Sequence, residues 1–229
     1  NAVGFIVGTV MFGTITYMPS YLLIVQGFTP TMAGLALLPM MFGLIGASTL
    51  SGTLISRTGR YKLQPIVSTA VLALGMVLLG TLGTDTHYVL VFIYTLLVGI
   101  GIGPVMSVGV TSIQNAVPHS VLGVGTASVQ MFRQIGGSLG VAVLGALFAN
   151  RLALETAAAG HPEGTAAYAP EAFNLLPSVE QLAMLEAYVA ALHPIFWVGA
   201  GAAILASLLS WLLVEVPLAD AHEQEREPS

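Results

Sequence analysis

The stretch 121-VLGVGTASVQMFRQIGGSLGVAVLGALF-148 is the most informative part of this chain, because it is long and apolar and yet contains one charged residue, Arg133. A membrane-spanning helix needs about 20 consecutive apolar residues, and this stretch supplies them. A charge within such a segment costs several kcal/mol unless a partner or water reaches it. Arg133 is therefore a functional-site hypothesis from the outset, and the rest of the chain is interpreted around it.

The composition predicts an integral membrane protein in contact with a lipid bilayer. The chain has 229 residues, of which 55% are hydrophobic and 7% charged, whereas soluble domains carry about 25% charged residues. The absence of cysteine excludes disulfides and thiolate metal sites, and HPEG at 161–164 lacks companion ligands, so we predict neither metal nor cofactor. A net charge of −5 gives no support to nucleic-acid binding. The apolar start at Asn1 favours a fragment, the C-terminal part of a longer polytopic chain.

We predict an all-α fold in which one domain, residues 1–216, forms a six-helix transmembrane bundle. The apolar runs are too long for barrel strands and do not alternate. The predicted spans are about 2–25, 32–55, 65–83, 88–114, 122–149 and 191–214.

A long outer loop is predicted over 150–190, irregular over 156–177 and then helical from a capping box formed by Ser178 and Gln181. That helix leads through Pro194 into the last span. The polar tail 217–229 is predicted to be disordered and cytoplasmic.

The basic residues predict the orientation. Arg57, Arg60, Lys62 and Arg226 fall on one side of the predicted membrane, and Arg151 falls alone on the other. Since cytoplasmic loops are enriched in Lys and Arg, both ends of this multi-pass chain are predicted to be cytoplasmic, in the cell membrane.

The short basic loop SGTLISRTGRYK at 51–62 admits two interpretations. Gly52 permits close helix approach, and Gly59 permits a tight turn before Arg60. In the first interpretation the cations only fix the topology. In the second, Arg57 and Arg60 form a gate that pairs with neighbouring helix C-termini and holds the inner face shut in one state.

Helical spacing places Arg133 on a stripe that should face protein or water rather than lipid. Its companions are Thr126, Gln130, Gly137 and Gly140, with Gln134 beside it. Two small-xxx-small pairs, Gly99 with Gly103 and Gly136 with Gly140, predict close backbone packing between helices. Pro104 predicts a local bend.

Acidic residues are absent from the centres of the predicted spans. Asp85, Glu155 and Glu215 lie at span edges, and the other acids lie in the outer loop or tail. No span therefore offers Arg133 a carboxylate partner, and no proton carrier is visible in this chain.

Four motifs give the chain a family resemblance over residues 1 to about 215. The loop signature G-x-L-x-x-R-x-G-R/K, TPTMAGLALLPM, GIGIGPVMSVGVTSIQNAVP and GVGTASVQMFRQIGGSLGVAVLGALF resemble the C-terminal half of the major facilitator superfamily, in the fourteen-helix drug:proton antiporter branch of EmrB/QacA type.

The resemblance implies one half of a secondary transporter that exports drugs or small amphipathic compounds by alternating access, with multidrug efflux and antibiotic resistance as the biological setting. Its expected partners are the missing N-terminal half, a small-molecule substrate and protons, and the proton-carrying acids would lie in that half. Tyr17 and Tyr21 become substrate-contact candidates, because the equivalent helix lines the cavity in the family; membrane anchoring is the alternative for Tyr21.

For Arg133 two roles stay open: pairing with helix carbonyls or an acid of the missing half as a gating element, or lining the cavity and contacting substrate. Two other functions compete with transport. One is a non-transporting membrane scaffold or receptor. The other is an intramembrane enzyme, which needs a nucleophile–base pair that Ser107, Ser112, Ser128 and Ser138 lack at matching depth.

Overall fold

The computed structural model describes residues 1–59, 62–158, 160 and 177–212. It contains seven α-helices and a single 3-10 turn within those ranges, and no strand, which confirms the predicted all-α fold. The elements are α1 (Ala2–Ile24), α2 (Pro30–Leu35), α3 (Leu38–Thr58), α4 (Leu63–Leu79), α5 (Tyr88–Ala116), η1 (His119–Val121), α6 (Leu122–Ala158) and α8 (Ser178–Trp211).

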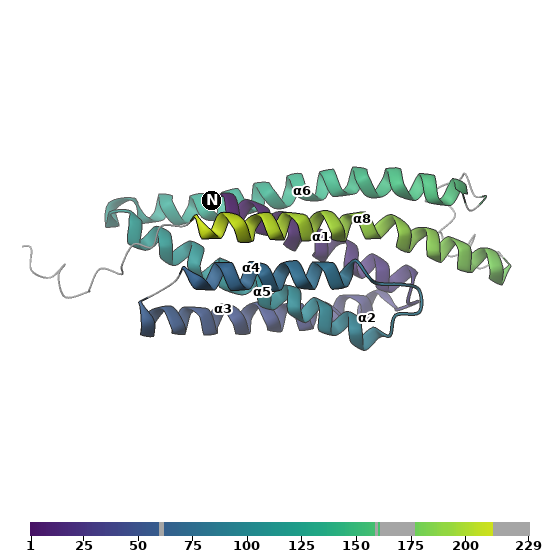
Figure 1. Ribbon diagram of the computed structural model, residues 1–229, viewed down its shortest axis with the longest axis horizontal. Helices are drawn as coiled ribbons and strands as arrows, with labels where there is room; N and C mark the ends of the chain where they lie inside the picture. Colours follow the sequence, from purple (N-terminus) through teal and green to yellow (C-terminus); the bar gives the residue numbers. More distant parts are fainter. Residues whose placement is uncertain (60–61, 159, 161–176, 213–229) are drawn as a thin grey trace, which may run out of the picture.

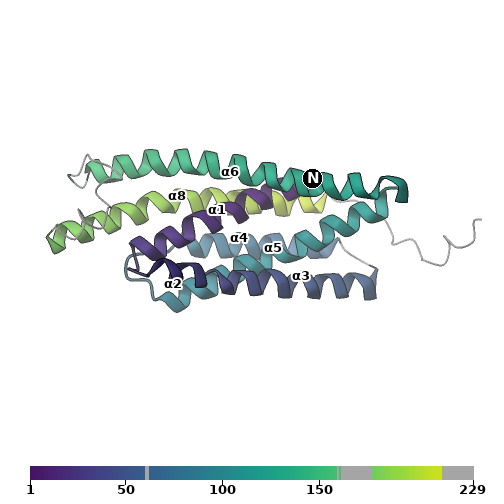
Figure 2. The same ribbon diagram turned by 180° about the vertical axis from the view of Figure 1, so that it is seen from behind.

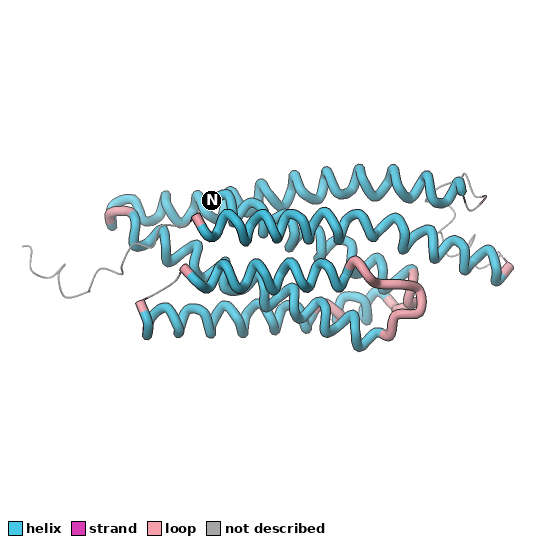
Figure 3. Tube along the Cα trace, viewed as in Figure 1, coloured by secondary structure: helices cyan, strands magenta, loops and turns pink. Residues whose placement is uncertain are grey.

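The long helices lie side by side along one axis (Figure 1; Figure 2 shows the opposite side). Helix α3 packs against α5, α1 against α6, and α4 against both α5 and α8. The connections gather at the two ends of the bundle (Figure 3). We call the end that holds the α3–α4 connection, with Arg57 and Lys62, the basic end, and the other the far end.

Among the described residues, five helical segments are long and apolar enough to cross a membrane, while α4 is shorter. The segments are α1, α2 together with α3, α5, α6 and α8. The predicted third span, 65–83, is realised as a helix that ends at Leu79 and is followed by a turn at Gly80.

The predicted outer loop over 150–190 differs from the structure at its start, whereas the helix predicted from Ser178 is present. Helix α6 continues to Ala158 and α8 begins at Ser178, and both extend past the other helices at the far end (Figure 1). Contact between the two helices is the physical reason: the rings of Phe148 of α6 and Tyr188 of α8 pack edge to face with centroids 5.3 Å apart, and Leu152 of α6 is buried. The irregular stretch predicted at 156–177 is thus helical to Ala158; residues 161–176 and the tail 217–229 lie outside the described residues.

The start of α8 also differs from the predicted capping box. Pro177 is the N-cap residue, with an extended backbone at φ −58° and ψ 148°, and Ser178 is already helical. The carbonyl of Pro177 accepts a hydrogen bond from the backbone N–H of Gln181 at 3.0 Å. The helix then runs without a break through Pro194.

Helices α1 and α6 cross in close backbone contact. A Cβ at Gly136 would overlap the carbonyl of Phe5, and one at Gly140 would lie 2.9 Å from the Cα of Thr9. The hydroxyl of Thr9 donates to the carbonyl oxygen of Gly136 at 2.8 Å. Glycine at these positions lets the two backbones meet, as small residues do at helix crossings in membranes.

A second close crossing joins α3 to α5. A Cβ at Gly99 would overlap the carbonyl of Met40, and one at Gly103 would lie 2.8 Å from the backbone nitrogen of Ser48. The hydroxyls of Ser48 and Ser107 lie 2.8 Å apart. Helix α5 continues through Pro104, directly after this contact.

Candidate functional site

Arg133 lies on α6, about 16 Å along the helix axis from Leu122. Its backbone packs on Gly8 of α1, where an added Cβ would overlap the carbonyl of Arg133 and come within 3.0 Å of its Cγ. Gly8 therefore makes room for the stem of the arginine. The side chain is half-buried, and within the described residues it forms neither a hydrogen bond nor an ion pair.

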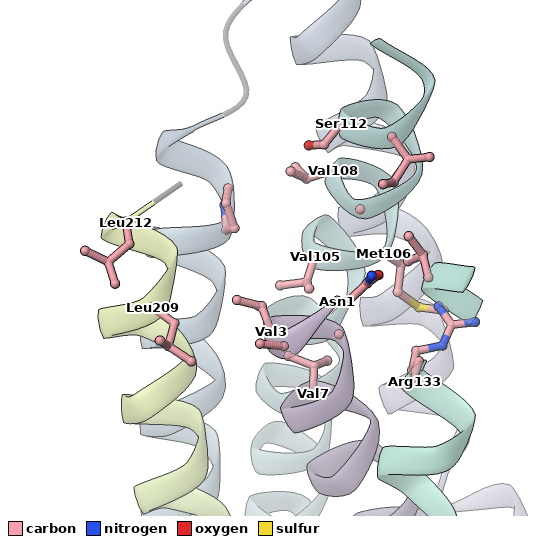
Figure 4. A pocket seen from close by; sticks show the side chains of 16 residues that line it. Asn1, Val3, Val7, Val105, Met106, Val108, Ser112, Arg133, Leu209 and Leu212 are labelled. Atoms are coloured by element: carbon pink, nitrogen blue, oxygen red, sulfur yellow. The ribbon is translucent and has the colours of Figure 1, made fainter. Parts of the chain in front are cut away.

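A cavity of about 430 Å³ opens beside this arginine, at the basic end of the bundle. Helices α1, α4, α5, α6 and α8 all contribute to its wall (Figure 4). Most of the wall is apolar, with Val7, Val105 and Leu209 among its members, and Arg133 is the one charged side chain among the described residues that line it. Arg133 thus meets a cavity inside the bundle.

Ser112 supplies another polar group to the same cavity, besides Arg133 and the amide of Asn1. Its hydroxyl points from α5 into the space toward the side of α8 (Figure 4). That oxygen is buried and has no hydrogen-bond partner in the described part of the chain. A buried hydroxyl without a hydrogen-bond partner lowers the stability of a protein by about 1–3 kcal/mol. A bound molecule that accepts a hydrogen bond from Ser112 would therefore be stabilised there.

The stripe predicted around Arg133 divides into two faces. The glycines lie against α1: a Cβ at Gly137 would overlap the ring of Phe12. Gln130 and Gln134 are exposed on the other face. Thr126 is half-buried, and its hydroxyl donates to the carbonyl of Leu122 in its own helix at 2.9 Å.

The basic loop only partly follows its prediction. Gly59 ends α3 in the left-handed conformation, at φ +67°, and its N–H donates to the carbonyl of Ile55. The close helix approach predicted at Gly52 is not made, since no described atom lies within 4 Å of a Cβ placed there. Arg57 is exposed in the last turn of α3, and Arg60 lies outside the described residues.

The two tyrosines of α1 do not lie on an open wall. Tyr17 is 7% exposed and stacks in a tilted geometry on Phe148 of α6, with ring centroids 5.5 Å apart. Tyr21 is fully buried, and its hydroxyl donates to the carbonyl of Gly83 at 2.8 Å. Tyr21 is thus a tie between α1 and the α4–α5 turn, and not an interfacial anchor.

The roles of Gly8 and Ser112 at the site were missed from the sequence. Gly4 and Gly8 form a small-xxx-small pair that could have marked Gly8 as a packing residue, whereas Ser112 stands out in the sequence only as a possible nucleophile. Their roles depend on which faces of α1 and α5 turn toward α6. A spacing pattern within one helix does not contain that information.

Comparisons with known proteins agree with the resemblance seen in the motifs. Residues 2–141 match the model of the Major Facilitator Superfamily. The chain is 37% identical to an uncharacterized MFS-type transporter of Mycobacterium tuberculosis, over 96% of this chain and 32% of the relative. It is 40% identical to a tetracycline resistance determinant of Streptomyces rimosus, over 63% of this chain and 42% of that protein.

The multidrug transporter protein MdtP of Bacillus subtilis is 35% identical over 64% of this chain and 27% of its own length. The chain thus spans about a third of the length of its mycobacterial relative. The family match covers more than half of the chain, and the bundle is all-α with membrane-length helices. This chain therefore belongs to the major facilitator superfamily, as a multi-pass membrane bundle that fits one half of such a transporter.

Proposed function

We propose that this chain is the C-terminal half of a secondary transporter that exports drugs or other small amphipathic compounds by alternating access. The observation that carries the proposal is the exposure of two edge helices in a bundle that bears the family's sequence. The membrane-length windows of α3 and α6 are each 22% buried, against 44% for α1 and α5 and 50% for α8. A second bundle packed on α3 and α6 would cover these faces.

Relatives support export of antibiotics or drugs as the function, because two of them are named a tetracycline resistance determinant and a multidrug transporter protein. In this proposal the basic end faces the cytoplasm, as the distribution of Lys and Arg predicts. The membrane is the cell membrane. Arg57, in the last turn of α3, then lies where an inner gate would form.

The proposal includes coupling to protons, with the titrating acids in the other half. No Asp or Glu lies in the central turns of the described helices; Asp85 is in the α4–α5 turn and Glu155 near the end of α6. Arg133 would then face an acid of the other half, the substrate, or both in turn. Its half-buried, unpaired state in the described residues leaves it available for either contact.

Flux through the full-length protein in proteoliposomes tests this function. With an imposed pH gradient, we expect uptake of tetracycline or of fluorescent amphiphiles into inside-out vesicles, and collapse of that uptake on addition of an uncoupler. Uptake that persists with the uncoupler would contradict proton coupling alone. No uptake of any probe, by protein that is folded and correctly inserted, would contradict transport itself.

A further inference from the structure

The described wall of the cavity at the basic end is mostly apolar, with one charged side chain, one unpartnered hydroxyl and the neutral amide of Asn1. Arg133 and Ser112 supply the charge and the hydroxyl, and Val105 and Val108 lie between their levels in Figure 4. The wall includes no Asp or Glu among its described residues. The described wall therefore favours a negatively charged group over a positively charged one.

We propose that this cavity binds amphipathic anions, with the apolar body among the valines and leucines and the anionic group at Arg133. The inference rests on the proposed function and deepens it, because it names the class of compound that the transporter takes up at its basic end. The hydroxyl of Ser112 donates to a further acceptor on the same molecule. A cationic amphiphile finds no counter-charge among the described residues of this wall.

The size of the cavity suits such a compound. Its volume of about 430 Å³ falls in the range of about 300–1,000 Å³ that small-molecule sites occupy. Along α5, the 112 − 105 = 7 residues from Val105 to Ser112 rise about 10 Å. A molecule of two or three rings can therefore reach from the level of Arg133 to that of Ser112.

The charge argument follows from the cost of an unpaired guanidinium in an apolar wall. An isolated buried charge is destabilising, and an opposite charge brought close in a low-dielectric site recovers much of that cost. The same field repels a cation. Arg133 has no ionic partner in the described chain, so its field in the cavity is not cancelled there.

The described wall of the site comes from α1, α4, α5, α6 and α8, all within this bundle. When the acid of the other half is not paired with Arg133, the guanidinium is free to hold an anion in this cavity. In the transport cycle, this position would serve as a loading site at the basic end.

A single cysteine at position 112 tests the sign of the field. The chain has no cysteine, so Ser112→Cys in the full-length protein, with any cysteine elsewhere replaced by serine, reports on this cavity alone. We would measure its modification by sulfonatoethyl and trimethylammonioethyl methanethiosulfonate, each divided by that reagent's rate with a free thiol in solution. Any shift in the thiol's own ionisation cancels in the ratio of the two rates.

We expect the anionic reagent to react about tenfold faster than the cationic one after this normalisation, as one unpaired charge at about 10 Å predicts. Arg133→Gln should bring the ratio to about one, and Arg133→Lys should keep most of it. Equal rates, a ratio that Arg133→Gln leaves unchanged, or a cysteine that reacts with neither reagent would overturn the proposal. Variants are compared only when they elute as one folded species.

Ligand protection tests the chemical class with matched probes. 8-Anilinonaphthalene-1-sulfonate should slow the reaction of Ser112→Cys with the neutral methyl methanethiosulfonate at least fivefold. N-phenyl-1-naphthylamine, which has the same rings without the sulfonate, and the cation tetraphenylphosphonium should protect much less. The protection should be lost with Arg133→Gln; equal protection by all three probes would overturn the anion preference.

The two claims fail separately. Proton-driven flux without any charge preference at position 112 would support the proposed transport and contradict the proposed anion site. A clear anion preference in a protein that transports none of the probes would support the anion site and contradict the proposed transport.

Discussion

At the scale of single residues, Arg133 is the group whose replacement should separate transport from folding. We expect Arg133→Ala in the full-length protein to lower proton-driven flux about tenfold or more, equivalent to at least about 1.4 kcal/mol of barrier, with less than a twofold loss of membrane abundance. The stem of Arg133 packs on Gly8, but its guanidinium holds no partner in the described chain, so the fold does not depend on the charge. Flux and quantitative immunoblotting of the same membranes measure both.

Arg133→Lys is the control for geometry. Lysine keeps the positive charge but lacks the planar fork that binds two acceptors at once. Partial flux with lysine would indicate that charge matters most, whereas loss equal to that of alanine would indicate a forked contact. Equal losses of flux and abundance in Arg133→Ala would favour the structural role instead.

The sequence could single out Arg133, because a charge in an apolar run is visible without any structure. It could not show that Tyr21 is tied to the carbonyl of Gly83, since that contact joins α1 to a turn 62 residues away in the chain. For the same reason the sequence predicts Tyr17 on a cavity wall, although it is buried and packs on Phe148 of α6. Features of one residue were predictable, and contacts between distant helices were not.

At the scale of elements, the α1–α6 crossing should tolerate no side chain beyond hydrogen at Gly136. We expect Gly136→Ala to destabilise the protein by about 1–3 kcal/mol, the usual cost of overpacking, because its Cβ would overlap the carbonyl of Phe5. The thermal midpoint in detergent, followed by size-exclusion chromatography, measures the change.

Gly123→Ala is the matched control in the same helix. No atom of the described chain lies within 4 Å of a Cβ at Gly123, and alanine favours helix over glycine by up to about 1 kcal/mol. This variant should be neutral or stabilising. If Gly136→Ala behaved like Gly123→Ala, the crossing would be looser than described.

Three hydrogen bonds hold the α4–α5 turn at the far end. Besides the 2.8 Å bond from Tyr21 to Gly83, Gln26 donates to the carbonyl of Thr86 at 3.0 Å. A ring nitrogen of His193 lies 2.7 Å from the carbonyl oxygen of Leu82. The turn is thus fixed to α1 and to α8.

Tyr21→Phe should loosen this turn without unfolding the bundle. It leaves the carbonyl of Gly83 without the tyrosine's hydroxyl, at a cost of about 1–2 kcal/mol, so amide exchange over residues 80–87 should accelerate about tenfold. Tyr94→Phe is the control, because the hydroxyl of Tyr94 makes no hydrogen bond in the described structure. Unchanged exchange in Tyr21→Phe would show that the other two bonds suffice.

Element lengths mark the limit of prediction from periodicity. The apolar runs located the long helices, but RLALETAA at 151–158 looks like a helix end when taken alone. Leu152 and Thr156 are buried in the bundle, where α6 packs against α1 and α8, so the extension of α6 is stabilised by helices far away in the chain. Tertiary packing, rather than local preference, sets where these helices stop.

At the scale of the whole molecule, the exposed faces predict where the other half docks. The amides of Gln130 and Gln134 are exposed on α6, and amides are costly to leave in hydrocarbon. In the C-terminal part of α8, from Ile204 to Trp211, the exposed side chains are all apolar and include Leu205 and Leu208. We therefore predict that the open face of α6 meets protein or water in the full-length transporter, while α8 faces lipid.

Spin labels at Gln134→Cys and Leu208→Cys in the full-length protein separate these faces. Oxygen concentrates in lipid, so the Leu208 label should relax through collisions with oxygen several times faster than the Gln134 label. A water-soluble nickel chelate should show the opposite order or reach neither. Equal oxygen access at both positions would mean that α6 lies against lipid. The exposed amides would then need another explanation, and the half-transporter would have to dock through another face.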